Sequence, residues 1–190
     1  MKKRFALGLF SGMLMGLIVT VVIGIIMLPT IVDYVWFKNL GLSSPDIAER
    51  RIDTDTSRLY QMDLVASNGD TTNLSKFKDK LIFINFWATW CRPCIAEMPS
   101  IEKLQNELAG NPKVAIVLVS SEDLTIVKRF IDRTKFPLPF YTSKDRNTVF
   151  DRRVLPVTYI IHDNKIIYKH TGSADWSSSE VVDFIAERTK

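Results

Sequence analysis

One apolar run, KLIFINFWA at residues 80–88, constrains the fold most strongly, because it ends just before the only two cysteines of a 190-residue chain. A short apolar run of this kind, bounded by polar residues, is typical of a strand that is buried on both faces. After the cysteines, Cys91 and Cys94, apolar residues recur at helical spacing until Gly110. The sequence therefore predicts a central strand that leads into a helix, with the cysteine pair at the junction.

Strands and helices alternate along the chain from residue 58 onward. This alternation, followed by a terminal hairpin and helix, predicts an α/β fold with a central mixed sheet flanked by helices and an N-terminal β-hairpin extension. The expected elements are a leading hairpin around Asn68 and Gly69, a strand at residues 113–121, a helix at 122–135, a short strand at 138–143, two strands within 157–172 joined at Asp163 and Asn164, and a last helix from 177–179 to 187.

The charge of the chain gives no case for nucleic-acid binding. Three of its 25 basic residues are Lys2, Lys3 and Arg4, so 22 basic residues remain against 21 acidic residues in the rest of the chain. A nearly neutral body lacks the basic surface that binding to nucleic acid requires. We therefore expect no nucleic-acid partner.

The first residues predict a membrane anchor. Three positive charges precede residues 5–28, which contain no charged residue. As a helix this run is ~36 Å long at ~1.5 Å per residue, enough to cross a hydrocarbon core of ~30 Å. A cleaved signal peptide, the alternative, would have an apolar region of about 7–15 residues before a small-residue cleavage site. We expect residues 1–32 to form a basic cytoplasmic flank and one transmembrane helix, residues 33–57 a juxtamembrane tether, and residues 58–190 an outer domain.

Four glycines of the expected anchor share one stripe. Gly8, Gly12, Gly16 and Gly24 follow a four-residue spacing, which lets helix backbones approach closely. This pattern predicts a dimer mediated by the anchor. The alternative is the ordinary abundance of glycine in transmembrane helices.

Three uses of the cysteine pair follow from the residues. A structural disulfide between near neighbours would constrain little of the unfolded chain. A zinc site needs three or four ligands, and the chain adds only His162 and His170, on opposite sides of a predicted turn. A redox pair fits best, because a helix start favours the thiolate of Cys91, and two intervening residues bring Cys94 within disulfide reach. We therefore expect no metal.

The stretch INFWATWCRPCIAEMP at residues 84–99 resembles the active-site motif of membrane-anchored extracytoplasmic thioredoxins of the TlpA/ResA type. The resemblance extends over about residues 59–187. A second family signature, an X-Pro loop before a strand, matches VLPVTYII at residues 154–161. The resemblance implies a thioredoxin fold, thiol–disulfide oxidoreductase activity and no cofactor.

The resemblance also implies catalytic roles. Cys91 would attack a disulfide and Cys94 would resolve the mixed disulfide. Glu97 stands at the family's glutamate position and would accept the proton of Cys94, unless it is simply an exposed glutamate in the first helical turn. Pro156 would follow a cis peptide bond beside the sulfurs. Asn85 replaces the aspartate of cytoplasmic thioredoxins, and we expect it to be a structural polar residue.

Residues that flank the cysteine pair and the proline loop are expected to contact substrate. The backbone before Pro156 would pair with an extended segment of the substrate protein. Arg152 and Arg153, just before this loop, form either a positive rim that selects acidic partners or a solvated charge pair. The expected substrate-binding residues are Trp90, Arg92, Pro93, Leu155 and Val157.

The resemblance predicts a membrane-anchored oxidoreductase that reduces specific protein disulfides outside the cytoplasm, as in cytochrome c maturation. The expected partners are protein disulfides, such as that of apocytochrome c, and a membrane electron donor of the DsbD/CcdA kind. The expected location is the bacterial inner membrane, with a single pass, a cytoplasmic N-terminus and a periplasmic C-terminal domain. The alternatives are a disulfide-forming oxidant, a thiol peroxidase and a non-catalytic membrane-tethered assembly module.

Overall fold

The computed structural model describes residues 20, 41–48, 58–145 and 149–190. Within this part of the chain, no helix has both the length and the apolar character needed to cross a membrane. The anchor expected at residues 1–32, with its glycine stripe, lies outside the described residues except for residue 20. The cysteines belong to a compact unit that comprises Leu42–Lys190.

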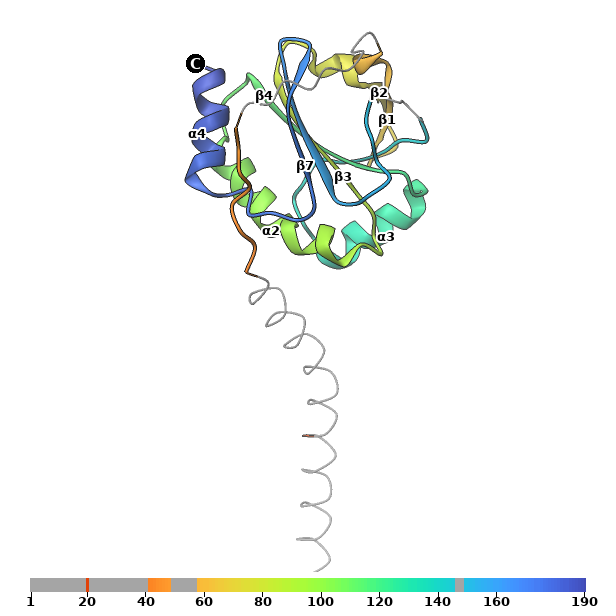
Figure 1. Cartoon of the computed structure of the whole chain (residues 1–190). Coiled ribbons are helices and arrows are strands. Elements are labelled where there is room, and N and C mark those ends of the chain that lie inside the picture. The colour runs from red at the N-terminus through yellow and green to blue at the C-terminus, as the bar shows by residue number, and fades with distance from the viewer. Residues whose placement is uncertain (1–19, 21–40, 49–57, 146–148) are drawn as a thin grey trace, which may run out of the picture. The chain divides into compact units, whose positions relative to one another are not determined.

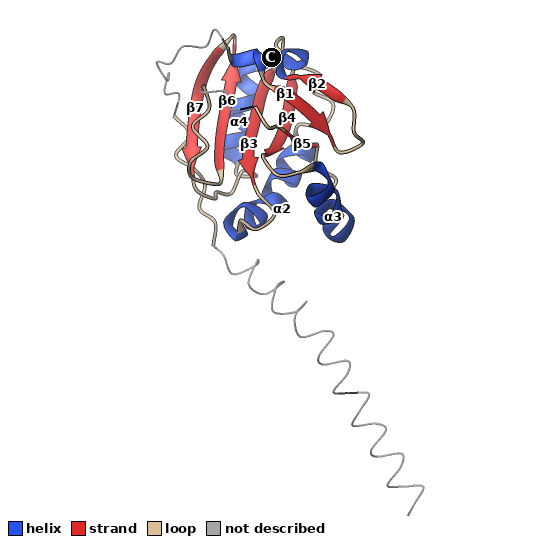
Figure 2. Ribbon diagram, turned by 90° about the vertical axis from the view of Figure 1, so that its right-hand side faces the viewer, coloured by secondary structure: helices blue, strands red, loops and turns tan. Residues whose placement is uncertain are grey.

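A mixed sheet forms the centre of this unit (Figures 1 and 2). Its strands are β1 (Asp63–Ala66), β2 (Thr71–Asn73), β3 (Leu81–Trp87), β4 (Val114–Ser120), β5 (Phe140–Thr142), β6 (Val157–His162) and β7 (Lys165–Thr171). They lie side by side in the order β2-β1-β5-β4-β3-β6-β7. The central strand β3 pairs in parallel with β4 and antiparallel with β6, so the expected mixed sheet is confirmed.

Helices and 3-10 turns cover the sheet. In the described residues they are η1 (Leu59–Gln61), η2 (Leu74–Phe77), α2 (Arg92–Glu107), α3 (Leu124–Thr134) and α4 (Ser179–Arg188). The predicted leading hairpin is also confirmed, because β1 and β2 pair antiparallel and the turn between them contains Gly69 at a φ of 99°. Only glycine adopts such a φ without steric cost.

The central strand is buried on both faces, as the apolar run predicts. All seven residues of β3 are buried. Phe83 and Trp87 join one core cluster with the buried residues of α2, α3 and α4, while Ile84 and Phe86 join a second cluster with residues of η1, η2 and β6. Figure 2 looks onto the sheet and shows α4 behind it. Alternation along the strand thus sends odd-numbered residues of β3 toward the helices.

The pairing of β3 with β6 brings two distant loops to one edge of the sheet. Phe86 pairs with Val157, so the last residues of β3 lie beside the first residues of β6. The cysteines follow the end of β3, and Pro156 immediately precedes β6. Antiparallel register alone therefore places the cysteine loop and the proline loop next to each other.

Candidate active site

Cys91 and Cys94 form a disulfide at the beginning of α2, with their Cα atoms 5.3 Å apart. Cys91 is the N-cap residue of the helix, and its Sγ accepts a hydrogen bond of 3.3 Å from the backbone N–H of Cys94. Pro93 occupies the first turn, where a missing N–H costs nothing. The sulfur of Cys91 thus faces the unpaired N–H groups and positive dipole of a helix start, which favour a thiolate once the bond is reduced.

Glu97 lies in the same helix, three residues after Cys94, and its side chain is fully buried. Residues three apart share one face of a helix, so Glu97 lies on the same face of α2 as Cys94. Its carboxylate accepts hydrogen bonds from the Asn85 amide at 2.8 Å, the Trp176 indole at 2.8 Å and the Ala174 backbone N–H at 3.1 Å. The alternative of an exposed first-turn glutamate is therefore wrong.

Burial makes the carboxyl group of Glu97 a weaker acid than an exposed glutamate. It raises the pKa of the carboxyl from 4.5 to about 7, although the hydrogen bonds from Trp176, Asn85 and Ala174 oppose part of the rise. A carboxyl group with this pKa exchanges a proton readily near neutral pH. The site thus combines a redox pair with a buried carboxyl group whose pKa is close to neutral.

Asn85 connects Glu97 to the sheet. Its side-chain amide donates to Oε1 of Glu97 at 2.8 Å and to the hydroxyl of Thr158 at 2.9 Å, and both Asn85 and Thr158 are buried. The two residues are also paired across β3 and β6. Asn85 is therefore a buried polar residue whose hydrogen bonds fix the position of Glu97.

Trp176 and its neighbours complete this arrangement, and no local sequence pattern predicts them. Trp176 is fully buried and lies 79 residues after Glu97, in the loop before α4. Its backbone N–H also donates to the hydroxyl of Ser100 on α2. The ring of His170 on β7 meets the Trp176 ring edge-on at 5.5 Å, and burial lowers the pKa of this histidine. Only an alignment of coupled positions could have linked such distant residues.

The Leu155–Pro156 peptide bond is cis, as the resemblance implies. Leu155 is half-buried and packs against the core cluster that contains both cysteines. Val157 differs from the expectation, because its side chain is 1% exposed and packs in the core between Phe86 and residues of β7. Val157 therefore offers no side-chain surface to a substrate.

The other expected contact residues form an open rim around the disulfide. Arg92 and Pro93 are exposed, and Trp90 is 71% exposed, which is unusual for so large an apolar side chain. Val154, two residues before the cis proline, is 60% exposed and was not among the expected residues. Trp90 and Val154 are the two large apolar side chains that stand exposed in the described part of the chain. They flank the two loops that meet at the site.

The neighbouring arginines do not form a free positive rim. Arg153 binds both carboxylate oxygens of Asp151, at 2.9 and 3.0 Å, and Lys169 lies 3.7 Å from the same carboxylate. Arg152 donates to the carbonyl of Asp145 and lies over the ring of Phe86. These contacts fit a cluster of paired charges better than a positive surface that selects acidic partners.

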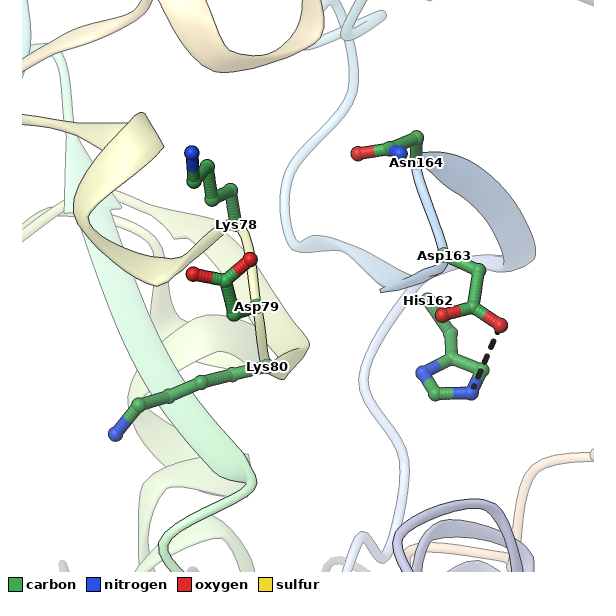
Figure 3. Close-up of a pocket in the computed structure, with 6 residues that line it drawn as sticks. All are labelled: Lys78, Asp79, Lys80, His162, Asp163 and Asn164. Atoms are coloured by element: carbon green, nitrogen blue, oxygen red, sulfur yellow. Dashed lines mark ion pairs between the residues drawn. The ribbon is translucent and has the colours of Figure 1, made fainter.

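A pocket of about 580 Å³ lies away from the cysteines (Figure 3). Residues 78–80, just before β3, line one side, and residues 162–164, in the turn between β6 and β7, line the other. His162 and Asp163 form an ion pair of 3.5 Å there. The pocket is at the start of β3, whereas the redox pair follows its end, so the pocket is no part of the redox site.

Comparisons with known proteins agree with this geometry. The Redoxin family model matches residues 41–185. The thiol-disulfide oxidoreductase ResA of Halalkalibacterium halodurans is 35% identical over 107 residues, which cover 55% of this chain and 61% of that protein. ResA of Oceanobacillus iheyensis is 30% identical over 167 residues, 86% of this chain and 79% of that protein. The chain thus matches less than two thirds of the length of the H. halodurans protein.

A solved structure shows the same fold. The crystal structure of a thiol:disulfide interchange protein of the thioredoxin family from Chlorobium tepidum covers 74% of this chain and 99% of its own, with a TM-score of 0.56 and 20% identity. A thioredoxin fold with a cysteine pair at the start of its α2 helix defines a thiol–disulfide oxidoreductase. The sequence relatives carry the same activity in their names. The chain belongs to the Redoxin family and, within it, to the ResA-like thioredoxins.

Proposed function

We propose that this oxidoreductase is a reductant of specific protein disulfides outside the cytoplasm, anchored in the inner membrane by residues 1–32. The observation that carries the proposal is the buried Glu97 carboxylate, three residues after Cys94 on the same helix face and held by three hydrogen-bond donors. In a reductant Cys94 must lose its proton before it attacks, and a carboxylate on the same helix face can accept that proton. The pKa of about 7 suits that transfer at neutral pH.

The reaction proceeds in two exchanges. The Cys91 thiolate attacks one sulfur of the substrate disulfide, forms a mixed disulfide and releases the other substrate sulfur as a thiolate. Cys94 then gives its proton to Glu97 and attacks the sulfur of Cys91. The Cys91–Cys94 disulfide forms, and the second substrate thiolate leaves. Two electrons have passed from the cysteine pair to the substrate, and a membrane donor of the DsbD/CcdA kind restores the dithiol.

The rim of the site favours a substrate segment with apolar residues beside its cysteine. Trp90 and Val154 expose apolar surface on the two loops that meet there, while the nearby Arg153 is paired with Asp151. An extended segment would lie along the backbone at Leu155, strand to strand. Apocytochrome c is one candidate substrate, because the motif at residues 84–99 resembles that of a family that includes cytochrome c maturation reductases.

The deciding experiment is the reduction potential of the Cys91–Cys94 pair in the full-length protein, equilibrated with glutathione or dithiothreitol buffers. A value near roughly −270 mV, the thioredoxin range, supports a reductant. A value near roughly −120 mV, the range of strong oxidants, would replace the proposal with a disulfide-forming function. A Cys94→Ser variant should accumulate mixed disulfides with the physiological substrates, whereas Cys91→Ser should not.

A further inference from the structure

Three successive residues in the loop before α4, Ala174, Asp175 and Trp176, connect Glu97 to Ser43 through their backbone N–H groups. The N–H groups of Ala174 and Trp176 bind buried acceptors, and that of Ala174 donates to Oε2 of Glu97 at 3.1 Å. Between them, the N–H of Asp175 donates to the carbonyl of Ser43 at 2.9 Å. One short loop is therefore fixed to α2 on one side and to residue 43 on the other.

Residues 43–47, which we call the strap, hold this loop at further points. The hydroxyl of Ser44 lies 2.8 Å from that of Ser178, at the N-cap of α4. Pro45 is buried, and Ile47 packs against the core cluster that contains Ala174 and Trp176. Figure 1 draws this segment in orange against the loop that leads into α4. The strap lies within the stretch expected to be a tether, yet it packs as part of the folded unit.

We propose that the strap is a positioning element for Glu97: it holds the loop at residues 174–178 in place and thereby keeps two hydrogen-bond donors, the N–H of Ala174 and the indole of Trp176, on the Glu97 carboxylate. The inference rests on the proposed proton-acceptor role of Glu97. It makes the segment that precedes the redox domain a part of its active site. The strap touches neither cysteine in the described contacts, so its effect passes through the loop.

Ser100 on α2 and the burial of Trp176 also hold this loop, and the strap adds the contacts on its other side. Both donors bind the same oxygen, Oε2, while Asn85 binds the other one, Oε1. If the loop moves away, Oε2 loses both donors and gains access to water, so the proton affinity of Glu97 must change. The other groups around the carboxylate, Asn85 and Thr158 on the sheet, carry no charge. His170, which meets the Trp176 ring, is the titratable neighbour to control for.

The test follows the reaction of the reduced, full-length protein with the aromatic disulfide 5,5′-dithiobis(2-nitrobenzoate) by stopped flow. Attack by Cys91 releases the first thionitrobenzoate, and attack by Cys94 on the mixed disulfide releases the second. The second phase alone requires removal of the Cys94 proton. Its rate is measured from pH 5 to pH 9 in the wild type, in the strap variant Pro45→Gly/Ile47→Ser, and in the exposed control Ala48→Ser.

We expect the strap variant to slow the second phase by about 10-fold and to shift its pH midpoint; this is less than the ~100-fold or more that a proton acceptor contributes, because Glu97 itself is still present. The first phase and the control variant should match the wild type. Backbone amides at residues 174–176 should exchange with deuterium faster in the strap variant. The milder Ile47→Ala and Ser44→Ala changes should give smaller shifts in the same direction, which keeps the test open if the double variant folds poorly.

Combining the strap variant with Glu97→Gln tests the positioning role of the strap separately from the proton-acceptor role of Glu97. If the strap acts through Glu97, the strap variant should not slow the second phase further when Glu97 is already replaced. Equal slowing in both backgrounds would overturn the inference, as would faster amide exchange with an unchanged second phase. A Glu97→Gln protein with a normal second phase would instead refute the proton-acceptor role itself, and with it a strap that works through that role.

Discussion

The carboxylate of Glu122 holds Thr89 at two points, by the backbone N–H at 2.6 Å and by the hydroxyl at 2.7 Å. Thr89 lies two residues before Cys91, in the loop that joins β3 to α2, and Glu122 follows β4. Ser120 adds a hydrogen bond of 3.1 Å to the same carboxylate. A carboxylate just after the neighbouring strand β4 thus fixes the loop that leads to the redox pair.

Replacement of Glu122 by alanine should destabilise the protein by about 2 kcal/mol, because the Thr89 N–H and hydroxyl lose a charged acceptor in a half-buried place. Urea unfolding of the oxidised protein measures the loss. Thr89→Ala removes only the hydroxyl contact and should cost less. In the double variant the costs should not add, since both changes remove the same bond. Full additivity would mean that the two residues are not coupled.

Glu97 should make the protein less stable as the pH rises. Its pKa is about 7 in the folded protein and close to 4.5 when unfolded, so the folded state holds the proton more tightly. The stabilisation is fully present below about pH 4.5 and is lost as the pH rises through about 7. Its size is on the order of 3 kcal/mol.

The measurement is the difference in unfolding free energy between wild type and Glu97→Gln at several pH values. Taking the difference cancels the opposite contribution of His170, whose pKa is lowered by burial. A difference that does not change between pH 4.5 and 8 would contradict the buried, proton-binding Glu97.

Asn85→Asp should create a second carboxyl beside Glu97, 2.8 Å from its oxygen in the present contact. Two such groups cannot both ionise easily, so the pair would share a proton to a higher pH than Glu97 alone. We expect a loss of about 2–3 kcal/mol at pH 8 and a much smaller loss at pH 5, measured by urea unfolding. Equal losses at both pH values would point to a packing defect instead, for which Asn85→Leu is the matched control.

Trp90→Ala and Val154→Ala should weaken substrate capture without weakening the fold. Both side chains are mostly exposed, so the unfolding midpoint should stay within the small range of surface changes. Loss of a large apolar contact at the interface should raise KM for a disulfide peptide with apolar flanks by about 10-fold. A peptide with polar flanks serves as the control substrate. An unchanged KM for the apolar peptide would remove these residues from the substrate surface.

The elements of the sheet follow from local pattern, and their predicted bounds are close to the observed ones. The apolar run at residues 80–88 contains β3, Leu81–Trp87, and the helix expected at 122–135 contains α3, Leu124–Thr134. The turn expected at Asp163 and Asn164 has both residues at positive φ, 48° and 62°, which suits the twist of a tight hairpin. Hydrophobic period and turn chemistry are local properties, so a single sequence shows them.

The surroundings of Glu97 depend on contacts that no local pattern reveals. Glu97 itself was found through its position in the motif, but its full burial results from Trp176 and Ala174, more than 75 residues away. Val157 shows the same limit, because its place next to Pro156 in the sequence does not reveal that its side chain is buried. Periodicity predicts which elements form, while the partners of a buried polar group depend on how those elements meet.

If residues 1–32 anchor the protein as proposed, the packed strap also limits how far the redox site can lie from the membrane. If all of residues 33–57 were a free tether, the domain could lie up to about 85 Å from its anchor, at ~3.4 Å per extended residue. Because the chain already packs on the domain from residue 43, only about ten residues remain between the proposed anchor and the folded unit, a reach of ~35 Å. A protein held so close to the bilayer would meet partners that are themselves at the membrane surface.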